Sequence, residues 1–402
     1  MSLTAASVPT TDIDLFDEEY LRDPLPFQHE LRELGPVVYL ERYDVHAMAR
    51  FDEVHRALTD WQSLQSAAGV GLADFIREKP WRPPSLLLEA DPPRHDAPRH
   101  VAESILSPRR LRARQPDWES AAAALVDEVL ARGPVFDAVT DLAQVFPLRV
   151  FPDAVGLGAD GRENLLPYGD FAFNAFGPRN RLVTDAAPHM GPVTEWIGEQ
   201  CRRENLAAGG FGQQIWEAAD RGDITPEQAP LIVRSLLTAG VDTTVTGIAA
   251  VIHAVATHPD QWDVLRADRS LLARAFEEAV RLESPVQAFF RTTTVDTEIA
   301  DGVVLPPRRK VVLLLGAANR DPRRWHDPDR FDLTRDPSGH VAFGMGLHQC
   351  VGQHVARLES TVVLDALLDR VDAIELAGAP VRHLNNTLRG WDHMPVRVTP
   401  RA

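Results

Sequence analysis

The spacing of apolar residues over the range 98–283 limits the possible folds of this chain more than any other feature. Apolar side chains recur there with the period of an α-helix almost throughout. The interruptions are glycine-containing pairs at residues 133–134, 177–178 and 209–210. The clearest helix begins at Thr225, where a cap, a proline at the first helical position and Gln228 form a capping box, and it extends toward His258. The spacing predicts a helix-rich protein.

Short strand patterns lie on both sides of this region. VVYL and VHAMAR predict a hairpin near the N-terminus, between helices over 27–34 and 51–60. Helices near 260–267 and 271–283 precede the strand patterns VQAFFRTTT, TEIA and KVVLLLG, and a last helix spans about Cys350 to Arg370. We therefore expect a mainly α fold with small β-sheets. Since no linker, charge block or repeat marks a boundary, we expect one domain over residues 1–402, with residues 1–20 loosely ordered.

Composition excludes several classes of function. A formal net charge of -16 opposes binding to nucleic acid or anionic lipid. No apolar stretch approaches the roughly 20 residues that a membrane-spanning helix needs, and the first residues lack a basic segment followed by an apolar one. We expect a cytoplasmic protein with no membrane contact and with free thiols at its two cysteines, Cys201 and Cys350.

One cysteine stands in an unusual setting, the sequence FGMGLHQCVG at residues 343–352. Cys350 opens a predicted helix, where unpaired N–H groups and the helix dipole favour a thiolate. The glycines allow a sharp turn and the approach of a flat group, against which Phe343 can pack. The residues alone leave open a small buried hydrophobe, a zinc ligand together with His348 and His354, or a Cys–His nucleophile.

This loop resembles the haem-binding loop of the cytochrome P450 monooxygenases, Phe-x-x-Gly-x-x-x-Cys-x-Gly, at every fixed position. The resemblance implies the P450 fold, a triangular, helix-rich domain with haem b between the long central helix and the Cys-loop helix. It implies that Cys350 is the thiolate ligand of the haem iron, and that Phe343, His348 and Gly352 contact the cofactor.

Further motifs support the same family. E278-A-V-R281 followed by R330-F331 resembles the family's Glu-x-x-Arg plus arginine triad, which implies a structural role for Glu278, Arg281 and Arg330. D91-P-P-R-H95-D-A-P-R99 resembles the family's segment at the haem propionates, and Arg291 and His348 occupy matching positions. The resemblance implies that His95, Arg99, Arg291 and His348 bind these carboxylates.

The segment A239-G240-V-D242-T243-T244 resembles the family's oxygen-activation segment, which implies that Asp242 relays protons and that Thr243 supplies a hydroxyl. On a continuous helix, Ser235, Thr238, Ala239, Asp242 and Thr243 would share a face about 140° wide. Ser235 would lie about 12 Å along the axis from Thr243, which suits one aromatic ring.

Longer similarity extends over nearly the whole chain, through WRPPS, FNAFGP, RSLLTAG, SPVQAFFRTTT and NNTLRG. It resembles bacterial P450s that oxidise para-substituted benzoic acids such as 4-methoxybenzoate, by O-demethylation or hydroxylation. Thr238 stands where that group commonly has serine. The implied substrate residues are Arg82, Ser85, Phe173, Phe176, Arg234, Ser235, Thr238, Ala239 and Phe289.

The resemblance also implies partners. With no flavin or Fe–S segment of its own, the chain would receive electrons, originally from NAD(P)H, through a [2Fe–2S] ferredoxin and its reductase, with O₂ as co-substrate. We expect a monomer that binds a small aromatic carboxylic acid. Alternatives are oxidation of a neutral phenol ether, terpene or fatty acid, or a non-catalytic haem-thiolate carrier or sensor.

Overall fold

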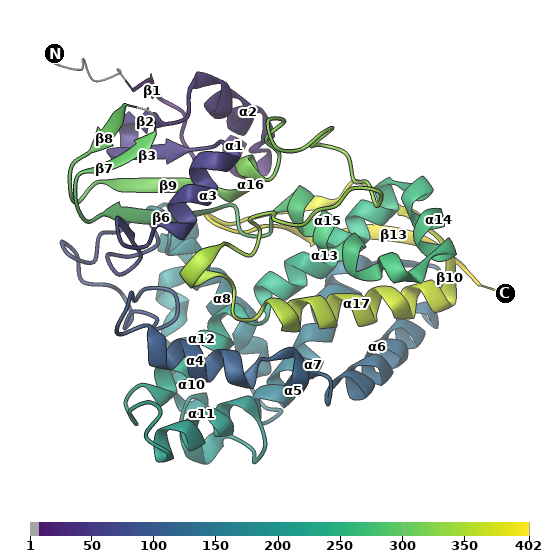
Figure 1. Ribbon diagram of the computed structural model, residues 1–402. Coiled ribbons are helices and arrows are strands. Elements are labelled where there is room, and N and C mark those ends of the chain that lie inside the picture. Colours follow the sequence, from purple (N-terminus) through teal and green to yellow (C-terminus); the bar gives the residue numbers. More distant parts are fainter. Residues whose placement is uncertain (1–7, 301, 402) are drawn as a thin grey trace.

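The computed structural model describes residues 8–300 and 302–401, and most of its regular structure is helical (Figure 1). The helices are α1 (Glu18–Arg22), α2 (Leu25–Leu34), α3 (Phe51–Thr59), α4 (Asp96–Ile105), α5 (Pro108–Leu111), α6 (Gln115–Leu130), α7 (Val145–Val155), α8 (Leu165–Asn174), α9 (Arg181–Ala186), α10 (Met190–Gln200), α11 (Phe211–Asp220), α12 (Ala229–Ala239), α13 (Asp242–Thr257), α14 (Pro259–Ala267), α15 (Leu272–Glu283), α16 (Leu315–Ala318) and α17 (Gln353–Arg370). The predicted helix-rich character is thereby confirmed.

The strands form small sheets, of which the largest lies at one corner of the molecule, at the upper left of Figure 1. Its order is β1 (Thr10–Thr11), β2 (Val38–Leu40), β3 (Val45–Met48), β9 (Lys310–Leu314), β6 (Ala288–Thr293) and β4 (Leu64–Gln65). The remaining sheets contain β10 (Val371–Leu376), β13 (Pro395–Pro400) and β5 (Val135–Asp137); β11 (Val381–Leu384) and β12 (Arg389–His393); and β7 (Thr297–Ala300) and β8 (Val303–Leu305). The predicted hairpin is the antiparallel β2–β3 pair.

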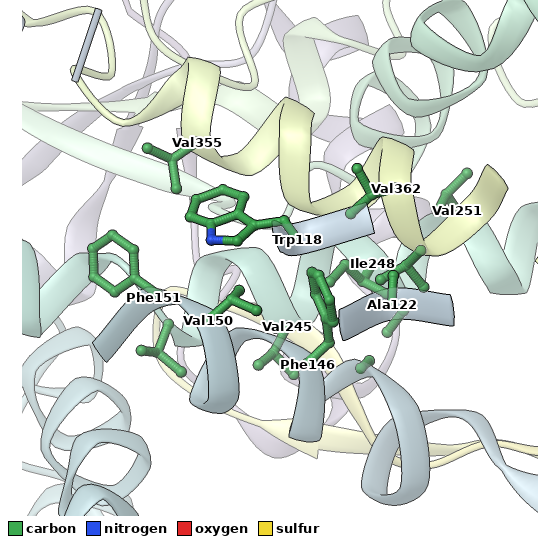
Figure 2. Packing of buried hydrophobic residues seen from close by; sticks show 14 of the residues in the cluster. Trp118, Ala122, Phe146, Val150, Phe151, Val245, Ile248, Val251, Val355 and Val362 are labelled. Atoms are coloured by element: carbon green, nitrogen blue, oxygen red, sulfur yellow. The ribbon is translucent and has the colours of Figure 1, made fainter. Parts of the chain in front are cut away.

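A single large hydrophobic cluster holds the helices together around α13, which packs against α15 and α17. Most residues of α13 are buried all round, as expected for a core helix rather than a surface helix. Figure 2 shows part of this cluster, with labelled side chains from α6 (Trp118, Ala122), α7 (Phe146, Val150, Phe151), α13 (Val245, Ile248, Val251) and α17 (Val355, Val362). This packing fixes α13 relative to α17, the helix that follows the cysteine loop.

The long helix predicted from Thr225 is two helices. Gln228 does accept a hydrogen bond from the Thr225 N–H at 2.8 Å, as the capping box predicts, but α12 begins only at Ala229. Gly240 and Val241 then interrupt the helix before α13. A Cβ at Gly240 would lie 2.2 Å from the Phe151 ring, so only glycine fits there. The prediction of one continuous helix was therefore wrong at its centre.

Two other predictions need correction. Val8 to Tyr20 is not loosely ordered, because β1 pairs with β2 and the side chains of Leu15 and Tyr20 are buried; residues 1–7 lie outside the described residues. The helical segment Ala229–Thr257 is long and apolar enough to cross a membrane by length and composition, contrary to our expectation. Since 67% of its most apolar window is buried inside the protein, its apolar character fits a core position.

Candidate functional site

A cavity of about 220 Å³ lies between the α12–α13 junction and the cysteine loop. It is lined at one end by Cys350 and the residues around it, and at the other by side chains from α12 and from the segment before α4. Every residue predicted to contact substrate lines this cavity: Arg82, Ser85, Phe173, Phe176, Arg234, Ser235, Thr238, Ala239 and Phe289. The structure thus brings together side chains from four separate parts of the chain.

Cys350 is held by a tight loop rather than by the first turn of a helix. Its backbone N–H donates to the Phe343 carbonyl at 2.8 Å, and α17 begins three residues later, at Gln353. Gly344 and Gly346 adopt φ angles of 66° and 68°, a left-handed conformation that favours glycine. The prediction that the helix extends from Cys350 was therefore wrong.

The electrostatics of Cys350 also differ from our expectation. Burial raises the pKa of the thiol above its ordinary value, although the Gly352 N–H and the charge of Arg99 act in the opposite direction. The helix start alone therefore does not favour a thiolate. A thiol in this setting loses its proton when a metal ion binds the sulfur.

Several basic side chains surround the cysteine end of the cavity. Arg99, Arg291 and His348 line it, and His95 packs edge-on against the His348 ring at 4.8 Å. His348 is paired with the Asp91 carboxylate at 3.0 Å, and Arg99 donates to the Gln349 carbonyl at 2.6 Å. Within the described part of the chain, neither ring nitrogen of His95 has a hydrogen-bond partner.

These basic groups are suited to haem. Arg291 is buried, and the one hydrogen bond that its side chain makes among the described residues is to the preceding carbonyl, of Phe290, at 2.8 Å. Burial lowers the pKa of Arg291 to about 10 and that of His95 to about 4. Buried donors without acceptors are costly, and the two propionates of haem would supply acceptors. The residues present therefore fit the predicted cofactor, with Cys350 as the iron ligand.

The zinc alternative has no support. In the residues that the structure describes, no group of three or more His, Cys, Asp or Glu side chains is placed to hold a metal ion. The His348 ring is hydrogen-bonded to the Leu87 carbonyl at 3.2 Å and to Asp91. It is therefore not free to join Cys350 in a zinc site.

The buried Glu–Arg pair of α15 forms as predicted, but with a different third residue. Arg281 donates to both oxygens of Glu278, at 2.7 and 2.9 Å, and both side chains are fully buried. Arg335, not Arg330, completes the triad, with its Nε 2.9 Å from Glu278 Oε1. Arg330 is exposed and lies 3.6 Å from Asp260. The assignment of Arg330 was wrong because only its carbonyl, not its guanidinium, reaches the pair.

The two residues of the predicted relay point in different directions. Thr243 lines the cavity, and its hydroxyl donates to the Ala239 carbonyl at 2.7 Å across the helix interruption. Asp242 is absent from the described cavity lining, and its carboxylate lies against Gly169 of α8. A Cβ at position 169 would be 1.8 Å from Asp242 Oδ2, so glycine is required for this approach. Burial, with a contribution from Asp170, raises the pKa of Asp242 well above its ordinary value.

A chain of polar side chains connects this region with solvent. His383 of β11 bridges Asp170 and Asp392, with each ring nitrogen 2.7 Å from a carboxylate oxygen. Asn385 also donates to Asp170, at 2.7 Å. Although burial favours the neutral ring, the two carboxylates raise the pKa of His383 to about 10. Half of the Asp392 side chain is exposed, so Asp242 has a charged, solvent-linked neighbourhood.

The far end of the cavity carries hydroxyl and guanidinium groups. Ser85 Oγ and Ser235 Oγ lie 3.0 Å apart, and Arg234 donates to the Pro83 carbonyl at 2.6 Å. Ser85 Oγ also accepts the N–H groups of Leu87 and Leu88, each at 3.2 Å. Since Ser235 Oγ donates to the Leu231 carbonyl at 2.9 Å, Ser85 donates its proton to Ser235 Oγ. Burial and the nearby charge of Arg82 lower the pKa of Arg234. This end is polar and electropositive.

Aromatic side chains form the wall between the two ends. Phe173 and Phe176 contact edge-to-face at 5.8 Å, and Phe176 contacts Phe289 in the same way at 5.9 Å. All belong to one small apolar cluster beside the large core. The cavity is therefore apolar along its length and polar at both ends, an arrangement that suits an aromatic ring with an anionic group.

Sequence reasoning missed several residues of the site. Gly169, Asp170 and His383 surround Asp242, and Glu89 accepts two hydrogen bonds from Arg82. Glu89 could have been noticed as the one acid in the apolar stretch just before the Asp-Pro-Pro segment. No local pattern distinguishes the residues around Asp242, since α8 and β11 are more than 200 residues apart.

Comparisons with known proteins agree with this geometry. The cytochrome P450 family model matches residues 212–382. The chain is 56% identical to cytochrome P450 CYP199A2 of Rhodopseudomonas palustris over 98% of this chain and 96% of that protein. It is 30% identical to the cytochrome P450 monooxygenase PikC of Streptomyces venezuelae, over 98% of this chain and 95% of that protein. The structure of cytochrome P450 CREJ in complex with (4-ethylphenyl) dihydrogen phosphate superposes with a TM-score of 0.86, at 26% identity, covering 96% of this chain and 99% of that one.

Proposed function

This chain belongs to the cytochrome P450 family and is a monooxygenase that uses haem b and O₂, and we propose that its substrate is a para-substituted benzoic acid such as 4-methoxybenzoate. The observation that carries the proposal is the polar end of the cavity, where the two serine hydroxyls and two arginines converge at the end remote from Cys350. A carboxylate buried there would accept charge-assisted hydrogen bonds.

The charges at this end favour an anion. Arg82 is already paired with Glu89, at 2.8 Å. Within residues 8–300 and 302–401, Arg234 has no carboxylate within ion-pair distance, and its bond to Pro83 is to a neutral carbonyl. One positive charge is therefore uncompensated beside the hydroxyls of Ser85 and Ser235. A substrate carboxylate would balance it.

The order of the lining residues supports oxidation at the para position. Ser235 lies on α12 and Thr243 lies on α13, beyond the interruption at Gly240 and Val241, and both line the cavity. A benzoate anchored at Ser235, with its ring between Phe173 and Phe289, would direct its para substituent toward the cysteine end. Thr238 lines the cavity on this path, so its methyl group narrows the space beside the ring.

Named residues would hold the cofactor in this proposal. Cys350 would bind the haem iron, and the propionates would be held by Arg99, Arg291, His95 and His348. When bound, haem supplies the activation of O₂ and the transfer of one oxygen atom to the substrate. Gly344 and Gly352 line the cavity beside Phe343 and leave space for the porphyrin, against which the Phe343 ring would pack.

The chain's own residues would control protons. The Thr243 hydroxyl lies at the cavity, and Asp242 would exchange protons with solvent by way of Asp170 and His383, whose charges act on its pKa. Because burial raises the pKa of Asp242 well above its ordinary value, it favours the protonated carboxyl group, which is the form that can donate a proton. Asp242 is buried beside Gly169, so it has to turn toward Thr243 to deliver that proton.

Electron supply completes the proposal. Bacterial P450s typically receive electrons from NAD(P)H through partner proteins, and we propose a [2Fe–2S] ferredoxin with its reductase. A cytoplasmic location and a monomeric state remain predictions from the sequence.

Product analysis tests the proposed substrate. The haem-loaded enzyme is supplied with NADH, a ferredoxin, its reductase and 4-methoxybenzoate. Hydroxylation of the methoxy carbon gives a hemiacetal that collapses, so we expect 4-hydroxybenzoate and formaldehyde in equal amounts. Neutral 4-methoxytoluene is the control. Equal turnover of the two compounds, or NADH oxidation without product from the benzoate, would contradict the proposal.

A further inference from the structure

A buried carboxylate stands directly behind the polar end of the cavity. Glu89 is 3% exposed and is not among the described cavity-lining residues. Its Oε2 accepts hydrogen bonds from Arg82 Nη1 at 2.8 Å and from the Ser85 N–H at 2.7 Å. Its Oε1 accepts a longer bond from Arg82 Nη2, at 3.4 Å. Glu89 thus holds both a guanidinium and a hydroxyl-bearing residue that line the cavity.

Glu89 determines the net charge at the polar end of the cavity. Arg82 and Arg234 contribute two positive charges at the cavity surface, and Glu89 contributes one negative charge behind them. Buried Lys310 also interacts electrostatically with Glu89, and the other charges that act on Lys310 are Asp74, Arg291 and Glu78. The Lys310 ammonium is turned away onto backbone carbonyls, with bonds of 2.8 and 2.7 Å to those of residues 69 and 71. Of the carboxylates that raise the pKa of Lys310, Asp74 has a larger effect than Glu89.

We propose that Glu89 is a specificity residue, which limits the polar end of the cavity to ligands with one negative charge. This inference rests on the proposed function, since it takes that end as the anion-binding end. A monoanion balances the one uncompensated positive charge. A dianion brings a second negative charge that has no cation and faces the fixed carboxylate of Glu89.

Glu89 therefore has two separable effects. Its hydrogen bonds orient Arg82 and the Ser85 loop, and its charge sets the preference for ligands with one negative charge. Glutamine has almost the same shape as glutamate and can still accept from Arg82 and Ser85, but it carries no charge. Glu89→Gln thus changes the charge and keeps the shape, whereas Glu89→Asp keeps the charge and shortens the side chain.

Two tetrahedral anions of equal shape test the charge alone. At pH 8, 4-methylphenyl sulfate carries one negative charge, while 4-methylphenyl phosphate carries two, because the second pKa of a phosphate monoester is about 6. Dissociation constants are measured by calorimetry on the haem-loaded protein, with 4-methylbenzoate as the reference ligand. Glu78→Gln is the control, since Glu78 is an exposed acid in the same segment.

We expect the unchanged protein to bind the sulfate at least about tenfold more tightly than the phosphate. Glu89→Gln should reduce this preference by about tenfold, while Glu89→Asp and Glu78→Gln should retain it. The measurement on the unchanged protein tests the inference even where a variant folds poorly.

Three results would overturn the inference. One is an equal preference in the unchanged protein and in Glu89→Gln. Another is binding of 4-methylbenzoate with neither tetrahedral anion bound, which would show that shape and not charge excludes them; both leave the proposed function intact. Failure of 4-methylbenzoate itself to bind would refute the proposed function and the inference with it.

Discussion

Gly169→Ala is the most informative single change, because it alters the surroundings of Asp242 without touching the cavity. A Cβ at this position would lie 1.8 Å from Asp242 Oδ2, about half of an ordinary contact distance. The carboxyl group has to move by more than about 1.5 Å, away from α8. The substitution itself favours the helix by up to about 1 kcal/mol, so lost function would not reflect poor helix formation.

The expected cost follows from the role of Asp242 as a proton donor. A positioned acid contributes about 10²–10⁴-fold to the rate of a step that needs its proton. Because Asp242 is displaced rather than removed, we expect product formation to fall by about 10- to 100-fold, which corresponds to about 1.4–2.7 kcal/mol. NADH oxidation should fall less, so that less product forms for each NADH consumed.

The assay compares the unchanged protein with four variants for 4-hydroxybenzoate formed per NADH oxidised. Gly191→Ala in α10 is the matched control, since a Cβ there meets nothing within 4 Å, and it should behave as the unchanged protein. Asp242→Asn should be slower than Gly169→Ala. If Gly169 acts only by placing Asp242, the double variant should match Asp242→Asn within about twofold. Unaltered turnover in Gly169→Ala, or a loss that multiplies with that of Asp242→Asn, would refute this reasoning.

Three further changes test other parts of the structure. Arg335→Ala should destabilise the protein by about 3 kcal/mol in denaturant unfolding, because it removes a partner of the buried Glu278 carboxylate. Arg330→Ala should cost less than about 1 kcal/mol, since Arg330 is exposed. Equal costs would contradict the assignment of Arg335 to the triad. His383→Gln should destabilise the protein most below about pH 6.5, where the imidazolium is charged in both folded and unfolded chains. The difference in unfolding free energy between variant and unchanged protein should vanish as the pH rises through about 10. A pH-independent difference would contradict the ion pairs of His383 with Asp170 and Asp392. Cys350→Ala should abolish the thiolate-type absorption band of the reduced, carbon monoxide-bound haem protein, and an unaltered band would exclude Cys350 as the iron ligand.

Local motifs in the sequence predicted most of the cavity. The cysteine loop, the serine and arginine pairs and the phenylalanines occur in short segments whose spacing identifies them, and the structure places all of these side chains around one space. The small sheets and most helices could likewise be predicted, because each has its own apolar period and its own breakers. Features that depend on contacts between residues close in the sequence could therefore be predicted.

Long-range contacts could not be predicted in the same way. The helical-face argument placed Asp242 beside Thr243 and Ser235, but it assumed a continuous helix, and the interruption at Gly240 and Val241 removes that basis. Asp242 then lies in the first turn of α13, directed toward α8. Spacing also could not decide which arginine turns back toward α15, since that depends on the path of an irregular segment.

The affinity for an acid and its neutral amide tests the central claim most directly. Calorimetry of 4-methoxybenzoate and 4-methoxybenzamide compares two ligands of nearly equal shape, of which only the first carries a charge. Since charge-assisted hydrogen bonds contribute about 1.5–3 kcal/mol, we predict that the benzoate binds about 10- to 100-fold more tightly. Equal affinities would contradict an anion-binding end at Ser85, Arg234 and Ser235.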